Sequence, residues 1–163
     1  MSKKAKSEID RRIKRLDSTL LRLKKLDKEI DYDLQISSDI AKYFCVLVSG
    51  FLEQSIIYLI IEYSEDKSHK NIARFIEQNI DHWTNPKKEK IKNLLGSFKK
   101  EWGEKVEKTI IDQKHELLDS MIANRHNIVH GNDVGITVTR VESFYKNAKC
   151  VLLDIQNIIN EQG

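Results

Sequence analysis

Residues 44–61 read FCVLVSGFLEQSIIYLII, which is the most apolar stretch of the chain. On a helix drawn through this stretch, apolar side chains occupy nearly every face, as in the central helix of a bundle. Four polar residues between positions 49 and 55 interrupt the run, and such groups are costly inside a lipid bilayer. The pattern therefore predicts a buried core helix over about residues 35–63 and favours no contact with a membrane.

The composition of the chain argues against folds built from β-strands. Its 163 residues contain only one proline and six glycines, whereas a β-sandwich or barrel needs a turn signal about every 8–12 residues. Strands alternating with helices are disfavoured for the same reason. A content of 40% hydrophobic and 33% charged residues is typical of a globular protein with solvated helix faces. We therefore expect one all-α domain covering residues 1–163.

Helical spacing is visible on both sides of the core helix. Apolar residues recur every three or four positions from Ile9 to Ile30, which predicts a basic N-terminal helix within residues 1–30. A break is expected at residues 31–33, before the core helix. After the core helix we expect a polar turn at residues 65–70 and then a short helix.

The second half of the chain predicts two long helices and one short helix. Asn85-Pro86 has the form of an N-cap followed by proline in the first helical turn, so a short helix is expected from there to about Gly96. A long helix is expected from Gly103 to Gly131, where a glycine-containing turn follows. Residues 139–142 (TRVE) have the form of a capping box that opens the last helix. The expected architecture is a bundle of four principal helices with a short helical insertion between the second and the third.

Basic residues are concentrated in two segments of a chain whose formal net charge is only +3. Residues 1–30 carry eleven Lys or Arg against five Asp or Glu, and residues 87–105 carry seven lysines against three glutamates. Such faces permit nucleic-acid binding without establishing it, because lysine-rich helix surfaces often contact only water. Binding through them would weaken steeply with salt. The candidate RNA contacts in the second segment are Lys87, Lys88, Lys99 and Lys100.

The two cysteines bear on the compartment. Cys45 and Cys150 both lie in apolar stretches, which favours small core residues in a reducing compartment over a disulfide framework. The N-terminal lysines are not followed by an apolar stretch, so the pattern of a secretory signal is missing. We expect a cytoplasmic protein.

Two charged residues fall where the helical pattern expects apolar ones. At about 100° per residue, Arg125 lies in the middle of the apolar arc that includes Leu118 and Met121. Glu53 likewise lies among apolar residues of the core helix. Burying an unpaired charge costs several kcal/mol, so each residue needs a partner unless the arginine reaches the surface along its stem. We expect Glu53 and Arg125 to face one another.

A histidine follows this arginine at the end of the same helix. His130 lies five positions after Arg125, about 140° around the helix, and His126 shares the edge of His130. Arginine offers fixed cationic donors to phosphoryl oxygens, and histidine exchanges protons near neutral pH. The pair is suited to handling phosphate, but an Arg-x4-His spacing by itself is a weak motif.

The residues around this pair resemble the signature of HEPN domains. Residues 119–131 read DSMIANRHNIVHG at the end of an apolar helix, and an Arg-polar-x3-His segment sits on the third main helix of the HEPN bundle. The turn into residues 136–141 (ITVTRV), the stretch 51–53 (FLE) and the region 95–102 look most like the RiboL-PSP-HEPN branch. The resemblance covers residues 36–159 as a HEPN-like core and leaves the N-terminal helix outside it.

This resemblance implies a metal-independent endoribonuclease with RNA as substrate and no cofactor. Many members of the superfamily cut RNA in toxin–antitoxin, anti-phage and RNA-processing systems, and two copies of the motif meet in a homodimer to form one composite site. It implies that Arg125 and His130 are the catalytic pair and that attack by the 2′-hydroxyl leaves a 2′,3′-cyclic phosphate. An antitoxin or a defence-system protein is an implied partner. The residues expected to support the site are Glu53, Asn127 and His126, the last standing where Asn or Asp is commoner.

Two other functions remain open from the sequence. A HEPN domain can bind RNA, a nucleotide or a protein without cutting, and an RNA cleavage assay with His130→Ala distinguishes that case. His126 and His130 also have the i, i+4 spacing of helical metal ligands, with Asp133 nearby, but the glutamate of H-E-x-x-H is replaced by Asn127. Undiminished activity in EDTA would exclude this metal site. Three further histidines lie in polar contexts and are interpreted as surface residues: His69, His82 and His115.

Overall fold

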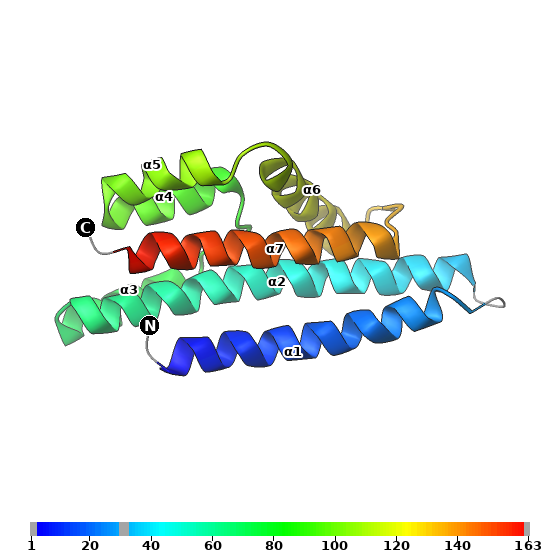
Figure 1. Ribbon diagram of the computed structural model, residues 1–163, viewed down its shortest axis with the longest axis horizontal. Helices are drawn as coiled ribbons and strands as arrows, with labels where there is room; N and C mark the ends of the chain where they lie inside the picture. The colour runs from blue at the N-terminus through cyan, green and yellow to red at the C-terminus, as the bar shows by residue number, and fades with distance from the viewer. Residues whose placement is uncertain (1–2, 30–32, 162–163) are drawn as a thin grey trace.

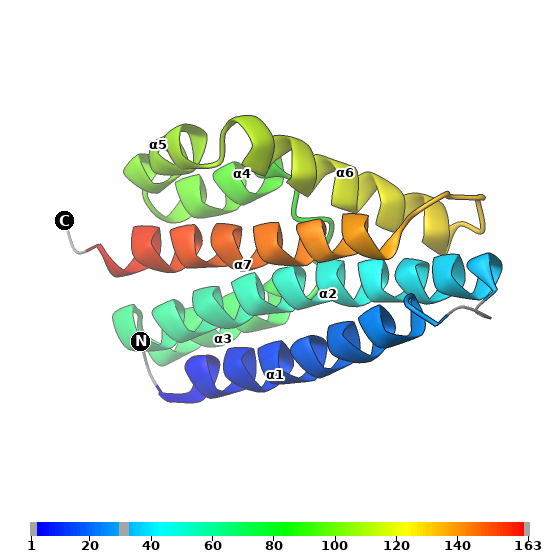
Figure 2. The same cartoon turned by 45° about the vertical axis from the view of Figure 1, so that its right-hand side comes forward.

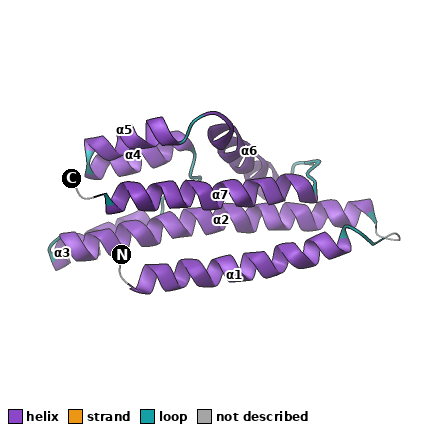
Figure 3. Ribbon diagram, in the orientation of Figure 1, coloured by secondary structure: helices purple, strands orange, loops and turns teal. Residues whose placement is uncertain are grey.

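The computed structural model describes residues 3–29 and 33–161 (Figure 1). These residues form seven helices and no strand, which confirms the all-α fold class (Figure 3). Four helices are principal ones, and three short helices form the insertion between the second and the third of them. The helices are α1 (Lys3–Leu26), α2 (Leu34–Lys67), α3 (Lys70–Ile80), α4 (Lys88–Phe98), α5 (Lys100–Thr109), α6 (Asp112–Val129) and α7 (Val138–Asn160).

Helix α2 lies at the centre of the molecule, between α1 and α7 (Figure 1). α1 packs along α2 and also touches α7, while α3 folds back on α2. α4 and α5 pair as a hairpin that contacts α7 through α5 and α6 through α4. α6 descends towards the N-terminal end of α2 on the side away from α1 (Figure 2). The end of α6 and the start of α2 therefore lie at the same end of the bundle.

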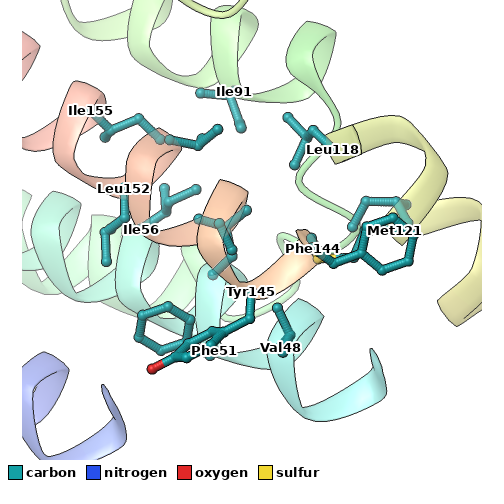
Figure 4. Close-up of a cluster of buried hydrophobic side chains, with 14 of the residues drawn as sticks. Val48, Phe51, Ile56, Ile91, Leu118, Met121, Phe144, Tyr145, Leu152 and Ile155 are labelled. Carbon is teal, nitrogen blue, oxygen red and sulfur yellow. The ribbon is translucent and has the colours of Figure 1, made fainter. Parts of the chain in front are cut away.

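The hydrophobic core joins residues from the principal helices and the insertion. Ile91 of α4 and Leu118 of α6 reach the same cluster as Ile155 of α7 (Figure 4). The Tyr145 ring lies edge-on to Phe51, with ring centroids 6.2 Å apart. Burying a large apolar side chain stabilises the fold by about 1.5–3 kcal/mol. The apolar run of the sequence is thus the central core helix, as predicted.

Helix α2 extends slightly beyond the predicted range of residues 35–63. The turn expected at residues 65–70 is wrong in its first half, because the helix continues to Lys67. The charged residues 65–67 are compatible with a helix and form its last turn. The C-cap of α2 is Ser68, whose backbone N–H donates to the Ser64 carbonyl at 3.0 Å. The Ser68 hydroxyl donates to the same carbonyl at 2.7 Å, so the Ser64 carbonyl accepts two hydrogen bonds at the end of the helix.

Within the described residues, α2 is the one helix that is long and apolar enough to cross a membrane by length and composition. In the structure, 61% of its most apolar window is buried inside the protein. The central helix of a bundle satisfies the same criteria, and α2 occupies that position (Figure 1).

Helix α1 is amphipathic and forms part of the bundle. Ile9, Leu16 and Leu23 follow one another at seven-residue spacing and are buried. The helix expected within residues 1–30 runs from Lys3 to Leu26. The expected break at 31–33 falls largely outside the described residues. Of these three positions only Asp33 is described, and its side chain caps α2 by accepting a hydrogen bond from the backbone N–H of Gln35 at 2.8 Å.

Tyr145 of α7 connects α1 to the core. Its hydroxyl donates to Asp17 Oδ1 at 2.8 Å and lies 3.2 Å from the carbonyl oxygen of Ile13. Burial, reinforced by the Asp17 carboxylate, raises the pKa of Tyr145 above its ordinary value. The ammonium group of Lys149 lies 3.7 Å from the same carboxylate. These contacts hold α1 against α7 along a polar seam.

The single long helix expected from Gly103 onward is wrong, because the chain forms α5 and α6 instead. The break between the two helices lies at Ile110 and Ile111. Together with Thr109 these are three consecutive β-branched residues, which have low helix propensity. Ile110 is fully buried at the break, and α6 begins at Asp112 with φ of +48°. α6 consequently takes a direction of its own rather than continuing α5 (Figure 2).

Two glycines that were expected to mark helix ends lie inside helices. A Cβ atom on Gly103 would be 3.2 Å from both the Gly96 Cα atom and the Lys92 carbonyl oxygen. The two glycines therefore allow the backbones of α4 and α5 to approach closely. α4 continues past Gly96 to Phe98, and α5 begins at Lys100.

The capping box expected at residues 139–142 is also wrong. The N-cap of α7 is Thr137, whose side chain accepts a hydrogen bond from the backbone N–H of Arg140 at 3.2 Å. Ile136 and Val138 on either side of Thr137 are buried and fix the entry of the chain into α7. The helix therefore starts before the residues that match the capping-box pattern.

The two cysteines lie in different environments. Cys45 is buried in α2, and this burial raises the pKa of its thiol to about 12. Cys150 is exposed on α7, so the prediction that it occupies the core is wrong. Of the three apolar residues that follow Cys150, Val151 and Leu152 are buried, whereas Leu153 is 56% exposed.

Candidate active site

The C-terminal turn of α6 is closed by Gly131, whose φ of +74° lies in the left-handed region that glycine adopts readily. The backbone N–H of His130 donates to the His126 carbonyl at 3.1 Å. The backbone N–H of Gly131 donates to the Ile128 carbonyl at 3.1 Å. His130 is thus fixed at the C-cap of α6, with its side chain exposed.

His126 and His130 form an exposed edge at this end of α6. Their ring centroids are 4.4 Å apart, and the ring planes are tilted by 57°. The contact follows from the i, i+4 spacing, which stacks side chains one above the other on a helix. Two imidazoles are therefore open to a bound molecule at the end of the helix.

Arg125 points to the other side of the helix and is half-buried. Its Nη1 atom donates a hydrogen bond to Asn85 Oδ1 at 2.6 Å. Asn85 belongs to the loop that joins α3 to α4. The guanidinium is therefore held by a neutral amide oxygen from a segment 40 residues earlier in the chain.

Glu53 is connected to the same loop. It is 9% exposed, and its Oε2 atom accepts a hydrogen bond from the backbone N–H of Asn85 at 3.0 Å. In the described part of the chain no salt bridge within 4.0 Å joins Glu53 to Arg125; each residue instead forms a hydrogen bond with Asn85. Asn85 of the α3–α4 loop connects the two residues, because its backbone N–H binds Glu53 and its side-chain oxygen binds Arg125.

The sequence did not identify Asn85 as a site residue, and its prediction as an N-cap is wrong. The N-cap of α4 is Lys87, which makes no side-chain capping bond. Asn85 has a φ of +56°, and its carbonyl accepts a hydrogen bond from the backbone N–H of Lys87 at 2.7 Å. Asparagine tolerates this left-handed conformation better than most residues, and a residue before proline is disfavoured in the helical region. An Asn directly before Pro86 is the only local signal that could have suggested this role.

Asn127 stabilises the turn that follows α6. Its carbonyl accepts the backbone N–H of Asn132 at 2.9 Å, and its Oδ1 atom accepts the Asn132 side-chain amide at 3.3 Å. The ammonium of Lys42 on α2 lies 3.7 Å from Asp133 in the same turn. The end of α6 is therefore held beside the N-terminal part of α2 (Figure 2).

The lysines predicted to contact RNA differ in their environments. Lys88 is only 8% exposed, and its ammonium donates to Glu107 Oε1 at 2.9 Å. Hydrogen bonds from Lys88 and Lys92 hold the pKa of Glu107 below its ordinary value. Lys88 thus joins α4 to α5, and this burial removes it from the candidate RNA contacts. Lys87 is exposed and remains a candidate.

Lys99 and Lys100 lie exposed at the connection between α4 and α5. The Lys99 ammonium is 5.1 Å from the centre of the Trp102 ring, and Lys100 is 3.9 Å from a Glu104 carboxylate oxygen. Exposed ion pairs of this length contribute little, so both lysines are available to a polyanion. The exposed face of α1 is also basic, through Lys6, Arg11, Lys14, Arg15, Arg22 and Lys25.

Over the described ranges 3–29 and 33–161, no group of three or more His, Cys, Asp or Glu side chains is arranged to hold a metal ion. Asp133, which the metal hypothesis places near the two histidines, has a 99% exposed side chain and an ion pair with Lys42. The competing metal site would therefore need ligands that this arrangement does not bring together.

The remaining three histidines lie outside the C-terminal turn of α6. His69 is the N-cap of α3, and its Nδ1 atom accepts the backbone N–H of Asn71 at 3.4 Å. His115 lies at the start of α6, 3.2 Å from Asp119, and His82 is exposed in the α3–α4 loop. These positions agree with the prediction of surface histidines.

A protein-family model described as RiboL-PSP-HEPN matches residues 7–161 of the chain. The match extends over most of α1, whereas the sequence resemblance was restricted to residues 36–159, so the N-terminal helix falls within the match. No curated protein matches the chain, and no solved structure matches it.

Proposed function

We propose, from the premise that this chain belongs to the RiboL-PSP-HEPN family, that it is a metal-independent endoribonuclease acting as a homodimer. Membership of the family supports a nuclease or another RNA-related role at a coarse level. The end of α6 supports the finer proposal, because it combines an anchored arginine with an exposed histidine, Arg125 and His130. The arginine offers a cation for the phosphoryl oxygens, and the histidine offers one of the two proton-transferring groups that the proposed cleavage uses.

The proposed reaction begins with the RNA 2′-hydroxyl. A His130 imidazole accepts the proton of this hydroxyl while the 2′-oxygen attacks the adjacent phosphorus atom. The bond to the 5′-oxygen breaks, and that oxygen takes a proton from a second imidazole, which leaves a 2′,3′-cyclic phosphate and a 5′-hydroxyl. Arg125 stabilises the negative charge on the phosphoryl oxygens. DNA lacks the 2′-hydroxyl and is not a substrate.

Helical geometry supports a site shared by two copies. Arg125 and His130 are separated by about 140° around α6, so their side chains diverge within one chain. Arg125 reaches inward to Asn85, whereas His130 faces solvent. A second copy placed against the exposed edge would add the second imidazole that the proton transfers need.

Exposed residues of α2, the helix that the end of α6 contacts, support the same arrangement. Ile36, Tyr43 and Gly50 follow at seven-residue spacing on α2, and Ile36 and Tyr43 are 49% and 55% exposed. A Cβ atom on Gly50 would meet nothing within 4 Å, although glycine within a helix costs about 1 kcal/mol relative to alanine. An open glycine that follows two exposed apolar residues in the same row permits close approach of another helix. We call Ile36, Tyr43 and Gly50 the outer face of α2 and propose that a second copy covers it.

Cleavage of a single-stranded RNA in EDTA tests the proposed activity. We expect His130→Ala and Arg125→Ala each to lower the rate by about 10²-fold or more, since a general acid–base group contributes about 10²–10⁴-fold and a donor that stabilises transition-state charge about 10²–10³-fold. His82→Ala, which removes another exposed histidine, is the matched control and should retain the parent rate. The products should carry 2′,3′-cyclic phosphate ends. RNA binding without cleavage, unchanged by either substitution, would favour a binding module instead.

Sedimentation equilibrium tests the proposed dimer. Tyr43→Glu places a charge on the outer face of α2 and should give a monomer without ribonuclease activity. Phe75→Glu is the matched control, because Phe75 is a 65% exposed aromatic residue on α3, a helix that packs on the C-terminal half of α2. A dimer that persists in Tyr43→Glu would exclude this face as the interface.

The implied biological role is that of a toxin or an anti-phage defence component. This part of the proposal rests on the family alone. Induced expression of the parent should arrest cell growth, and His130→Ala should not. A proteinaceous antitoxin should restore growth when the two are produced together.

A further inference from the structure

We infer that Asn85 is a positioning residue that orients Arg125 for the reacting phosphate without forming an ion pair with the guanidinium; this role rests on the proposed ribonuclease. The α3–α4 loop carries Asn85 into contact with both α2 and α6. One residue thereby links a buried carboxylate on the central helix to the arginine of the candidate site.

The first step of the argument concerns the backbone of Asn85. Its N–H donates to Glu53 Oε2 at 3.0 Å, and its carbonyl accepts the backbone N–H of Lys87 at 2.7 Å. Pro86, the next residue, is buried, and the Lys90 ammonium donates to the Thr84 carbonyl at 2.8 Å. The loop is therefore fixed on both sides of Asn85, and the peptide group at this position has little freedom.

The second step concerns the side chain. Asn85 Oδ1 accepts a hydrogen bond from Arg125 Nη1 at 2.6 Å. A fixed backbone gives this oxygen a fixed position, so it orients one edge of the guanidinium. Misplacing a reacting group by about 1 Å can cost about 10²-fold in rate. The left-handed φ of +56° explains why asparagine fits this position better than a β-branched or aromatic residue.

The third step concerns charge. The amide oxygen holds the arginine without forming an ion pair, so the cation can still stabilise a phosphoryl group. Glu53 Oε2 accepts the backbone N–H of Asn85, and no salt bridge within 4.0 Å joins Glu53 to the guanidinium among the described residues. A carboxylate at position 85 would pair with Arg125 and compete with the phosphate. The arrangement therefore supplies orientation without neutralising the cation.

Asn85→Gly is the most selective test, because glycine accepts the left-handed φ and keeps the backbone N–H that binds Glu53. We expect kcat to fall about 10- to 100-fold with KM changed less than about threefold. In an Arg125→Ala background, Asn85→Gly should lower kcat by less than about threefold further. A full additional loss in that background would overturn the inference, because Asn85 would then act independently of Arg125.

Asn85→Asp separates orientation from charge. It preserves the shape of the side chain but introduces a carboxylate, and we expect it to lower kcat as much as Asn85→Gly without lowering stability. Asp81→Gly is the matched control, since Asp81 is an exposed residue at the start of the same loop. It should retain the parent kcat. Parent activity in Asn85→Asp would overturn the part of the inference that concerns charge.

An NMR measurement tests the positioning without requiring cleavage. The guanidinium ¹⁵N signals of Arg125, assigned by their loss in Arg125→Ala, should show slow rotation in the parent and rapid averaging in Asn85→Gly. Rapid averaging in the parent would overturn the inference. Slow rotation in a parent that cuts no RNA would refute the proposed ribonuclease and leave Asn85 as the residue that orients Arg125.

Discussion

Replacing Tyr145 by phenylalanine tests how α1 is attached to the bundle. The substitution removes only the hydroxyl that donates to Asp17 Oδ1 at 2.8 Å, and it keeps the ring that packs edge-on against Phe44 and Phe51. The position is 1% exposed, so the replacement ring lies in the same apolar surroundings. Any loss of stability therefore reports the polar contact.

The expected magnitude follows from the partners of the hydroxyl. A hydrogen bond to a charged group contributes about 1.5–3 kcal/mol to stability. The Asp17 side chain is 53% exposed and keeps the Lys149 ammonium at 3.7 Å, so it is not left without partners. We therefore expect the lower end of the range, about 1.5 kcal/mol, which corresponds to a fall in Tm of about 3–6 °C for a protein of this size.

The pH dependence provides a second signature. The pKa of Tyr145 is raised in the folded protein, so its contribution is fully present below the ordinary tyrosine pKa of about 10 and is lost as the pH rises above that value. Urea unfolding should show the parent more stable than Tyr145→Phe at pH 8, with a gap that narrows above pH 10. Tyr63→Phe, which keeps the ring that packs edge-on against Phe98 and Trp102, is the control and should match the parent throughout. Equal stability of Tyr145→Phe and parent at pH 8 would refute the proposed attachment.

Three further predictions concern packing, thiol access and acid stability. Gly96→Ala should be tolerated, since its Cβ atom would make an ordinary contact at 3.6 Å. Gly103→Ala should have a free energy of unfolding about 1–3 kcal/mol lower than that of Gly96→Ala, because two backbone atoms would lie 3.2 Å from its Cβ atom. Thermal unfolding of both variants tests this difference. A thiol reagent followed by mass spectrometry should label exposed Cys150 in the native protein and buried Cys45 only after unfolding, and native labelling of Cys45 would contradict the packing of α2. Hydrogen bonds from two lysines lower the pKa of Glu142, so the stability that its carboxylate contributes is present at neutral pH and is lost as the pH falls below about 4.3. In Glu142→Gln, the free energy of unfolding should therefore fall less steeply with decreasing pH than in the parent. An unchanged decrease would contradict the ion pairs.

The α1 attachment also shows what a hydrophobic pattern leaves open. Ile9, Leu16 and Leu23 predict the helix and its buried face from the sequence, because their spacing repeats with the helical period. The pattern cannot show that Asp17 meets Tyr145, since the two residues are 128 positions apart. Only the antiparallel arrangement of distant helices creates that contact.

The main features of the fold were determined by the sequence itself. The apolar run from Phe44 to Ile61, with apolar side chains on nearly every helix face, favours the centre of a helical bundle, and scarce glycine and proline disfavour strand-based folds. The position of Arg125 on an apolar arc and of His130 at the helix end likewise follow from the 3.6-residue period and the Gly131 stop. These features are local, so the order of residues along one helix is sufficient to define them.

The contacts that join these elements were decided by the tertiary structure. Glu53 and Arg125 each lack a local partner, and the sequence suggests a direct pair, but the α3–α4 loop enters between them and Asn85 binds both. Lys88 lies in a lysine-rich stretch that predicts an exposed side chain, but it is buried and donates a hydrogen bond to Glu107 of the next helix. The periodicity of a sequence determines on which face of its helix a side chain lies. The residue that this side chain contacts depends on which distant segment of the chain packs against that face.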